Sequence, residues 1–112
     1  MPKTLFIDLD GTLVRHNYTP FDVDDVLLPG ALDFLLDARR AGHFCILTTN
    51  RSAAAAERIL ARLRNEAGFV FELTLFDLPV GIRVLINDTK GEEVRAVAIP
   101  VPRDQGLEDI RL

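Results

Sequence analysis

Cysteine is nearly absent from this chain, which has only Cys45 in 112 residues. One cysteine cannot close an internal disulfide, and because Cys45 lies in an apolar run we expect it to be a small core residue. The chain has no CxxC pair and only two histidines, His16 and His43, which are far apart in sequence. We interpret His16 as a flap residue and His43 as a helix-end residue, so the usual zinc sites are not expected.

Long apolar runs and an excess of positive charge are also missing. No stretch has the length of a transmembrane helix and no signal peptide is recognisable, so the simplest expectation is a cytoplasmic protein without a membrane partner. The formal net charge is -4, whereas phosphate backbones bind basic faces, so nucleic acid is not expected as a partner. The arginines between residues 39 and 64 are interpreted as solvated helix faces.

What is present fits one small folded domain over residues 1–112. The hydrophobic content is 48% and the charged content 27%, which is ordinary for a globular chain. Short apolar runs alternate with amphipathic stretches along the chain. The apolar runs predict a strand ending at Asp8 and a strand over Phe44–Leu47. The amphipathic stretches predict a helix from Pro29 and Gly30 to about Ala41 and a helix from Ala53 to about Ala67, with Ser52 as the N-cap of the second helix. This order predicts a parallel sheet with helices packed on its faces, and such sheets bind ligands at the carboxyl ends of their strands.

The last third of the chain predicts strands with no helix between them. The candidate strands are Phe69–Phe76, Arg83–Ile86 and Val94–Val101. The connection between the last two is too short for a parallel crossover, so we expect an antiparallel hairpin there. Pro100 and Pro102 suggest a sheet edge followed by a loosely held terminus.

Two carboxylates interrupt the apolar pattern of the stretch from Leu5 to Val14. Asp8 and Asp10 lie at the end of a strand that reads as buried, and burying an ionised carboxylate costs several kcal/mol unless it is paired or bound to a metal. Asp-Gly at residues 10–11 is also a common turn dipeptide, which would make the pair an ordinary acidic turn. Asp88 follows a second apolar strand, and if the two strands are neighbours the three carboxylates converge into an oxygen-rich site suited to Mg²⁺.

The string FIDLDGTLV at residues 6–14 is far more specific than Asp-Gly alone. It resembles motif one of the haloacid dehalogenase superfamily, whose members are mostly magnesium-dependent phosphatases and phosphotransferases. The resemblance implies a Rossmann-like, three-layer α/β sandwich with a mainly parallel sheet. It also implies that Asp8 is a nucleophile forming an aspartyl phosphate, that Asp10 is the general acid and base, and that Mg²⁺ is held by Asp8, the Asp10 backbone carbonyl and Asp88.

The phosphate-binding motifs of the family match this chain unevenly. Thr49, followed by Asn50, matches the second motif best, and Thr48 is the alternative by one step in register. The third motif requires a Lys or Arg, for which Arg83 is the first candidate and Lys90 the second. Arg83 can equally be interpreted as a strand residue whose side chain points to solvent. Asn87 before Asp88 also departs from the commoner Asp-Asp or Gly-Asp and removes one negative charge.

The chain leaves no room for the cap domain that larger members of the family carry. Only fourteen residues separate Val14 from Pro29, and only thirty-seven separate Asn50 from Asp88. We interpret the aspartates between Val14 and Pro29, at positions 22, 24 and 25, as a solvated loop. A capless site is open to water, so either a large substrate or another subunit must cover it, and we expect a homo-oligomer.

The predicted function is therefore a magnesium-dependent phosphomonoester hydrolase. Its substrate would be a phosphorylated small molecule, such as a sugar phosphate or nucleotide-sugar precursor, or a larger phosphorylated substrate. The alternatives are a phosphotransferase and a non-catalytic interaction or regulatory module. The intact pair Asp8 and Asp10 favours the two enzymes, because an inactive descendant need not keep the nucleophile.

Overall fold

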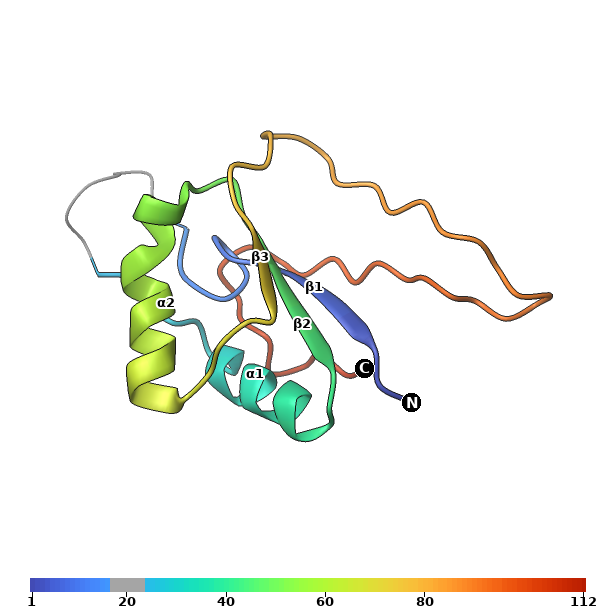
Figure 1. The fold of residues 1–112 in the computed structure, drawn as a ribbon, viewed down its shortest axis with the longest axis horizontal. Coiled ribbons are helices and arrows are strands. Elements are labelled where there is room, and N and C mark those ends of the chain that lie inside the picture. The colour runs from blue at the N-terminus through green and yellow to red at the C-terminus, as the bar shows by residue number, and fades with distance from the viewer. Residues whose placement is uncertain (17–23) are drawn as a thin grey trace.

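A parallel sheet of three strands carries the fold (Figure 1), which we describe from a computed structural model for residues 1–16 and 24–112. Strands β1 (Thr4–Asp8), β2 (Phe44–Thr48) and β3 (Leu73–Leu75) lie in the order β1-β2-β3. Asp8 pairs with Thr48, and Thr48 pairs with Leu75, so the carboxyl ends of the strands share one edge. The predicted α/β class with a parallel sheet is confirmed.

Both predicted helices are present, and local signals explain where they begin and end. Helix α1 (Ala31–Arg40) starts after Gly30, whose φ is 77°, a left-handed conformation that favours glycine. Helix α2 (Ala53–Ala67) starts at Ser52, whose side chain accepts a hydrogen bond of 3.1 Å from the backbone N–H of Ala55.

The core lies against one face of the sheet. Leu5 pairs with Cys45 and Ile7 with Leu47, so these four side chains point to the same side. They form one buried cluster together with Phe69 and the helix residues Ala31, Leu35, Ala38, Ile59 and Leu63. The expected burial of Cys45 is confirmed. Among the described residues both helices contribute to this single cluster, so the expected three-layer arrangement is not observed.

The opposite face of the sheet is only partly covered. Ile46 and Thr48 are buried there, whereas Phe6, Phe44 and Leu73 remain about half exposed. Phe6 pairs with Ile46, and Ile46 pairs with Leu73, so the side chains of these three residues form one row across the sheet. The sheet therefore presents an apolar surface on this side.

Residues 80–100 form an extended arm that leaves the sheet and returns to it (Figure 1). Within the described chain the arm has one backbone bridge, between Lys90 and Glu93 at its tip. The bridge lies outside the two predicted strands, so the antiparallel hairpin predicted between Arg83–Ile86 and Val94–Val101 is not observed. The arm contributes to a radius of gyration of 14.4 Å and a longest extent of 50 Å, against about 13 Å expected for the radius of a compact domain of this length.

Two other expectations for the last third of the chain need correction. The strand expected over Phe69–Phe76 is shorter, because Phe69 and Phe71 are buried in the core and only Leu73–Leu75 pairs with β2. The C-terminal segment is not loosely held, since Leu107 is buried and its N–H donates a hydrogen bond of 2.9 Å to the Pro29 carbonyl. Among the described residues no helix is long and apolar enough to cross a membrane.

Candidate functional site

The carboxyl end of β1 carries the first two candidate residues, Asp8 and Asp10. Immediately after the strand the carbonyl of Leu9 accepts hydrogen bonds from several following N–H groups, which makes a tight turn. Gly11 has a φ of 83°, so the turn requires a residue without a β-carbon. The Thr12 hydroxyl donates a hydrogen bond of 3.1 Å to Oδ2 of Asp8 and orients that carboxylate. The sequence Asp-Gly-Thr therefore builds the rim of the site.

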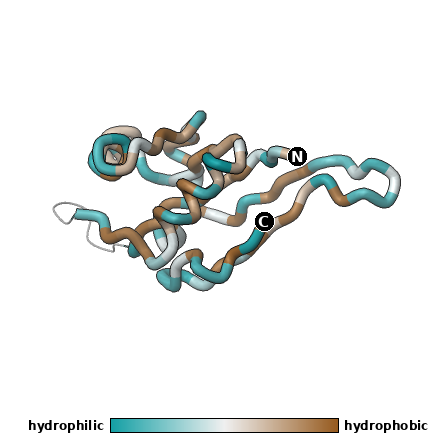
Figure 2. Tube along the Cα trace, turned by 90° about the horizontal axis from the view of Figure 1, so that it is seen from below, coloured by the Kyte–Doolittle hydropathy of each residue, from teal (hydrophilic) through white to brown (hydrophobic). Residues whose placement is uncertain are grey.

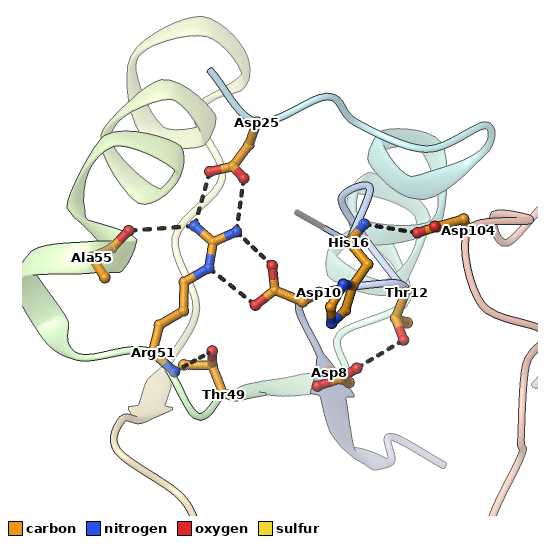
Figure 3. Close-up of polar contacts among 9 residues, drawn as sticks. All are labelled: Asp8, Asp10, Thr12, His16, Asp25, Thr49, Arg51, Ala55 and Asp104. Carbon is orange, nitrogen blue, oxygen red and sulfur yellow. Dashed lines mark hydrogen bonds and ion pairs between the residues drawn. The ribbon is translucent and has the colours of Figure 1, made fainter. Parts of the chain in front are cut away.

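A guanidinium group bridges two carboxylates beside this turn (Figure 3). Arg51 donates to Asp10 through Nη2 at 2.5 Å and Nε at 3.0 Å. It donates to Asp25 through Nη2 at 2.7 Å and Nη1 at 2.9 Å. The exposed fractions of the Arg51, Asp10 and Asp25 side chains are only 16%, 20% and 10%. Arg51 thus clamps the segment before α1 to the end of β1.

This arrangement corrects the prediction that the aspartates between Val14 and Pro29 form a solvated loop. Asp25 is largely buried in the clamp, whereas Asp24 pairs with Arg58 at the surface. Asp22 lies outside the described residues. Arg51 itself is not among the predicted site residues. Its position directly after Thr49 and Asn50, at the end of a strand facing the site, is the signal that could have identified it.

The clamp also fixes the charge of Arg51. Its hydrogen bonds with Asp25, and next with Asp10, raise the pKa of Arg51 further above its usual range, against the opposing effect of burial. The guanidinium is therefore a permanent positive charge at the site.

Arg83 provides a second cation at Asp8. Its Nη1 lies 2.9 Å from Oδ1 of Asp8, across 75 residues of sequence. Both side chains are partly exposed, so the ion pair is open to solvent and to a ligand. Lys90, the second candidate for this cation, lies at the tip of the arm.

The predicted phosphate-binding residues lie between β2 and α2, but they differ in accessibility. Thr49 is buried, and its Oγ1 accepts a hydrogen bond of 3.0 Å from the N–H of Arg51. Asn50 is exposed and lines the pocket. Thr48, the alternative to Thr49, is also buried, and its hydroxyl donates to the Ile7 carbonyl. Of these three residues, Asn50 is the one whose side chain is accessible to a ligand.

Asp88 is not brought to the other two aspartates within one chain. It lies in the arm, shortly before the bridge between Lys90 and Glu93 that closes the tip (Figure 1). The part of the chain that the structure describes contains no group of three or more His, Cys, Asp or Glu side chains arranged for a metal. Asp8 and Asp10 have the hard oxygen donors that Mg²⁺ takes, so the donor chemistry fits, but one chain supplies an incomplete set.

The surroundings of these residues form an open pocket with charges of both signs. Its charged lining consists of aspartates, arginines and one glutamate from the end of β1 and the turn after it, the segment before α1, α2 and the turn before it, the arm and the C-terminal segment: Asp8, Asp10, Asp24, Asp25, Glu66, Arg51, Arg58, Arg62, Arg83 and Arg103. Such a lining suits an anionic ligand held by guanidinium groups next to carboxylates. In comparisons with family models, curated proteins and solved structures, nothing matched the chain.

Proposed function

We propose that the protein is a magnesium-dependent phosphomonoester hydrolase of the haloacid dehalogenase type, with a Rossmann-like fold. The observation that carries this proposal is the contact of Asp8 with Arg83 and of Asp10 with Arg51 at the carboxyl ends of parallel strands. This juxtaposition offers a nucleophile, a proton-transfer group and two cations in one open pocket. The proposed substrate is a phosphorylated small molecule, such as a sugar phosphate or nucleotide-sugar precursor, or a larger phosphorylated substrate.

In the proposed reaction a carboxylate oxygen of Asp8 attacks the phosphorus atom. The bond from phosphorus to the ester oxygen breaks, and Asp10, after it turns from Arg51 to the substrate and takes up a proton from solvent, gives that proton to the leaving oxygen. Water then attacks the aspartyl phosphate on Asp8, Asp10 takes a proton from the water, and inorganic phosphate is released. Thr12 supports this chemistry by donating to Oδ2 of Asp8, which leaves Oδ1 facing the pocket side where Arg83 lies.

The two arginines have different proposed roles. Arg83 is partly exposed and contacts Asp8 directly, so its guanidinium can turn to the oxygens of a phosphoryl group that enters the site. Arg51 is held by Asp25 as well as Asp10, so it keeps one carboxylate partner when Asp10 turns to the substrate. Asn50 adds an accessible amide donor for a phosphoryl oxygen, while Thr49 is placed to shape the turn rather than to touch a ligand.

Mg²⁺ would be held by Asp8, Asp10 and Asp88. Asp88 lies in the arm, so it would have to move to Asp8 and Asp10 to complete this set. When bound, the ion would neutralise the repulsion between an anionic nucleophile and a phosphate dianion.

A non-catalytic module is the second candidate, and one observation favours it. Each aspartate of the pair already has an arginine partner, and ion pairs of this kind also occur in purely structural networks. In that case the same pocket would bind an anionic group of a partner without turnover.

Phosphate release separates these two functions. We expect magnesium-dependent release from an aryl phosphate or a member of a sugar phosphate panel, and a loss of about a thousandfold or more in Asp8→Asn, because the nucleophile is removed. Asp37→Asn is the matched control, since Asp37 lies on the exposed side of α1 and is 70% exposed. Unchanged activity in Asp8→Asn would refute the mechanism. No release by the wild type, with an anion still bound, would support the non-catalytic module.

A further inference from the structure

The C-terminal segment brings a further arginine to the site. Arg103 lines the same pocket as Asp8 and Asp10, although it lies near the other end of the chain. Its aliphatic stem crosses Gly11, because a β-carbon added at Gly11 would lie 3.0 Å from Cγ of Arg103 and 3.7 Å from its Cδ and Nε. The glycine therefore leaves the space that the stem occupies. Arg103 is nevertheless exposed, so a ligand in the pocket can reach its side chain.

The neighbouring residue, Asp104, fixes the position of Arg103 relative to the turn after β1. The N–H of Asp104 donates a hydrogen bond of 2.9 Å to the Gly11 carbonyl. The carboxylate of Asp104 accepts a hydrogen bond of 2.8 Å from the N–H of His16 (Figure 3). Asp104 has a φ of 62°, a left-handed conformation that is uncommon outside glycine. Such a conformation persists only where the surrounding contacts hold it. Arg103 is therefore presented to the pocket from a fixed backbone.

The position of Arg103 identifies the part of a substrate that it would meet. In the proposed reaction Asp10 protonates the leaving oxygen, so the leaving group has to lie next to Asp10. Gly11 follows Asp10 directly, with about 3.8 Å between the two Cα atoms, and the Arg103 stem packs against Gly11. The phosphoryl group, in contrast, has to meet Asp8, where Arg83 already lies. The two arginines therefore face different parts of the substrate.

From this arrangement we infer that Arg103 is a specificity-determining residue that binds a negatively charged group on the leaving alcohol. The preferred substrate class is a phosphomonoester with a second anionic group, such as a carboxylate or another phosphate, close to the ester oxygen. This inference rests on the proposed function, because the role of Asp10 as proton donor sets the side on which the leaving group lies.

The charges around the turn agree with this role. The Arg51 clamp and the ion pair of Arg83 with Asp8 join three carboxylates to two guanidinium groups. A substrate with two anionic groups brings further negative charge into the pocket. Arg103 supplies another guanidinium, a group that binds carboxylates and phosphates through two parallel hydrogen bonds. It therefore offsets part of the charge that this substrate class adds.

Two aryl phosphates that differ only in charge test the inference. The leaving groups of meta-carboxyphenyl phosphate and meta-carbamoylphenyl phosphate have nearly the same size, but only the first of these leaving groups is negatively charged. We expect the wild type to have a kcat/KM about tenfold or more higher for the carboxylate substrate, because a guanidinium forms charge-assisted hydrogen bonds with it.

Variants of Arg103 should remove this preference without removing the fold. Arg103→Met keeps an apolar stem over Gly11 but has no charge, so we expect similar kcat/KM values for the two substrates. Arg103→Lys keeps the charge and should retain part of the preference. Arg111→Met is the matched control and should keep the full preference. Arg111 lies in the same segment, but it donates to the carbonyls of Glu108 and Ile110 and does not line the pocket.

Phosphonate analogues of the two substrates separate binding from turnover, because they cannot be hydrolysed. Titration calorimetry with Mg²⁺ present should show about tenfold tighter binding of the carboxylate analogue by the wild type, and equal binding of both analogues by Arg103→Met. Equal binding by the wild type, binding of neither analogue, or a preference that persists in Arg103→Met would each overturn the inference. An equal loss for both analogues in Arg103→Met would place Arg103 at the phosphoryl group instead, and would also overturn it. A wild type that shows the preference but releases no phosphate would contradict the proposed hydrolase and leave the anion selectivity of Arg103 standing.

Discussion

Arg51 is the residue that joins most of the site together. It contacts Asp10 at the end of β1, Asp25 before α1 and the Ala55 carbonyl in the first turn of α2. A planar guanidinium can donate to two carboxylates at once, which a lysine ammonium cannot do with the same geometry. The position of Asp10 therefore depends on the shape of this side chain as well as on its charge.

Replacing Arg51 with lysine should destabilise the fold. We expect Arg51→Lys to lower the free energy of unfolding by about 2 kcal/mol, because two largely buried carboxylates lose their bidentate partner. Urea unfolding monitored by circular dichroism measures this loss. Arg40→Lys is the control, since Arg40 and Asp37 form an ion pair that is 72% and 70% exposed, and we expect a change below about 0.5 kcal/mol. Equal losses in the two variants would mean that the clamp adds no stability.

Cys45 should make stability fall at alkaline pH. Burial, and next the negative charge of Glu72, raise the pKa of the Cys45 thiol above its ordinary value of 9.0. Its contribution to stability is complete below the unfolded thiol pKa. As the pH rises above that value the unfolded thiol ionises while the native thiol keeps its proton, so stability is lost until the native thiol also ionises.

The matched variant for this prediction is Cys45→Ala, which removes the thiol and leaves every other titrating group in place. Between about pH 8 and pH 10, the free energy of unfolding should fall more steeply in the wild type than in Cys45→Ala. Chemical denaturation at each pH measures both slopes. Parallel slopes would contradict a raised pKa for this thiol.

At the scale of elements, the C-terminal segment acts as a brace between the β1 turn and the start of α1. The N–H of Asp104 donates to the Gly11 carbonyl, and the N–H of Leu107 donates to the Pro29 carbonyl. Gly106 makes this close approach possible, because its φ is +86° and an added β-carbon would lie 2.2 Å from the Pro29 carbonyl oxygen. The segment is therefore part of the scaffold that positions the site.

Gly106→Ala should consequently cost much more stability than Gly42→Ala. Gly42 has a similar φ of +79°, but an added β-carbon there would meet no atom within 4 Å. We expect about 1 kcal/mol for Gly42→Ala from backbone strain alone. Gly106→Ala should cost about 3 kcal/mol or more, because the clash with Pro29 adds to the same strain. Thermal unfolding of the two variants measures the difference, and similar values would show that the brace can move aside.

At the scale of the whole molecule, burial is uneven. One face of the sheet holds the core, while the other face and the arm expose apolar side chains such as Phe6, Phe44, Ile82 and Ile86. Monomeric proteins rarely expose contiguous apolar surface unless it serves an interaction. The apolar side chains on this face and on the arm, which carries hydrophobic stretches on both sides of its tip (Figure 2), therefore form a candidate interaction surface.

The local features of this protein were predictable from its sequence. The apolar periods predict the first two strands and both helices, and Ser52 and Gly42 mark the start of α2 and the end of α1, because periodicity and capping act within a few residues. The Asp-Gly-Thr turn also follows from local chemistry, since a left-handed glycine and a threonine hydroxyl suffice to build it. The position of Asp8 and Asp10 at a turn that follows a strand was therefore predictable from the sequence alone.

Contacts between residues far apart in the sequence were not predictable in this way. The Arg51 clamp joins residues 26 and 41 positions apart, and the Arg83 contact with Asp8 spans 75 positions. Such contacts depend on how elements pack, and no local period encodes that packing. The same limit applies to residues 82–86, whose alternating apolar pattern predicts a strand but does not say which sheet edge that strand would meet. A strand requires a partner, and among the described residues the arm pairs with no strand of the sheet.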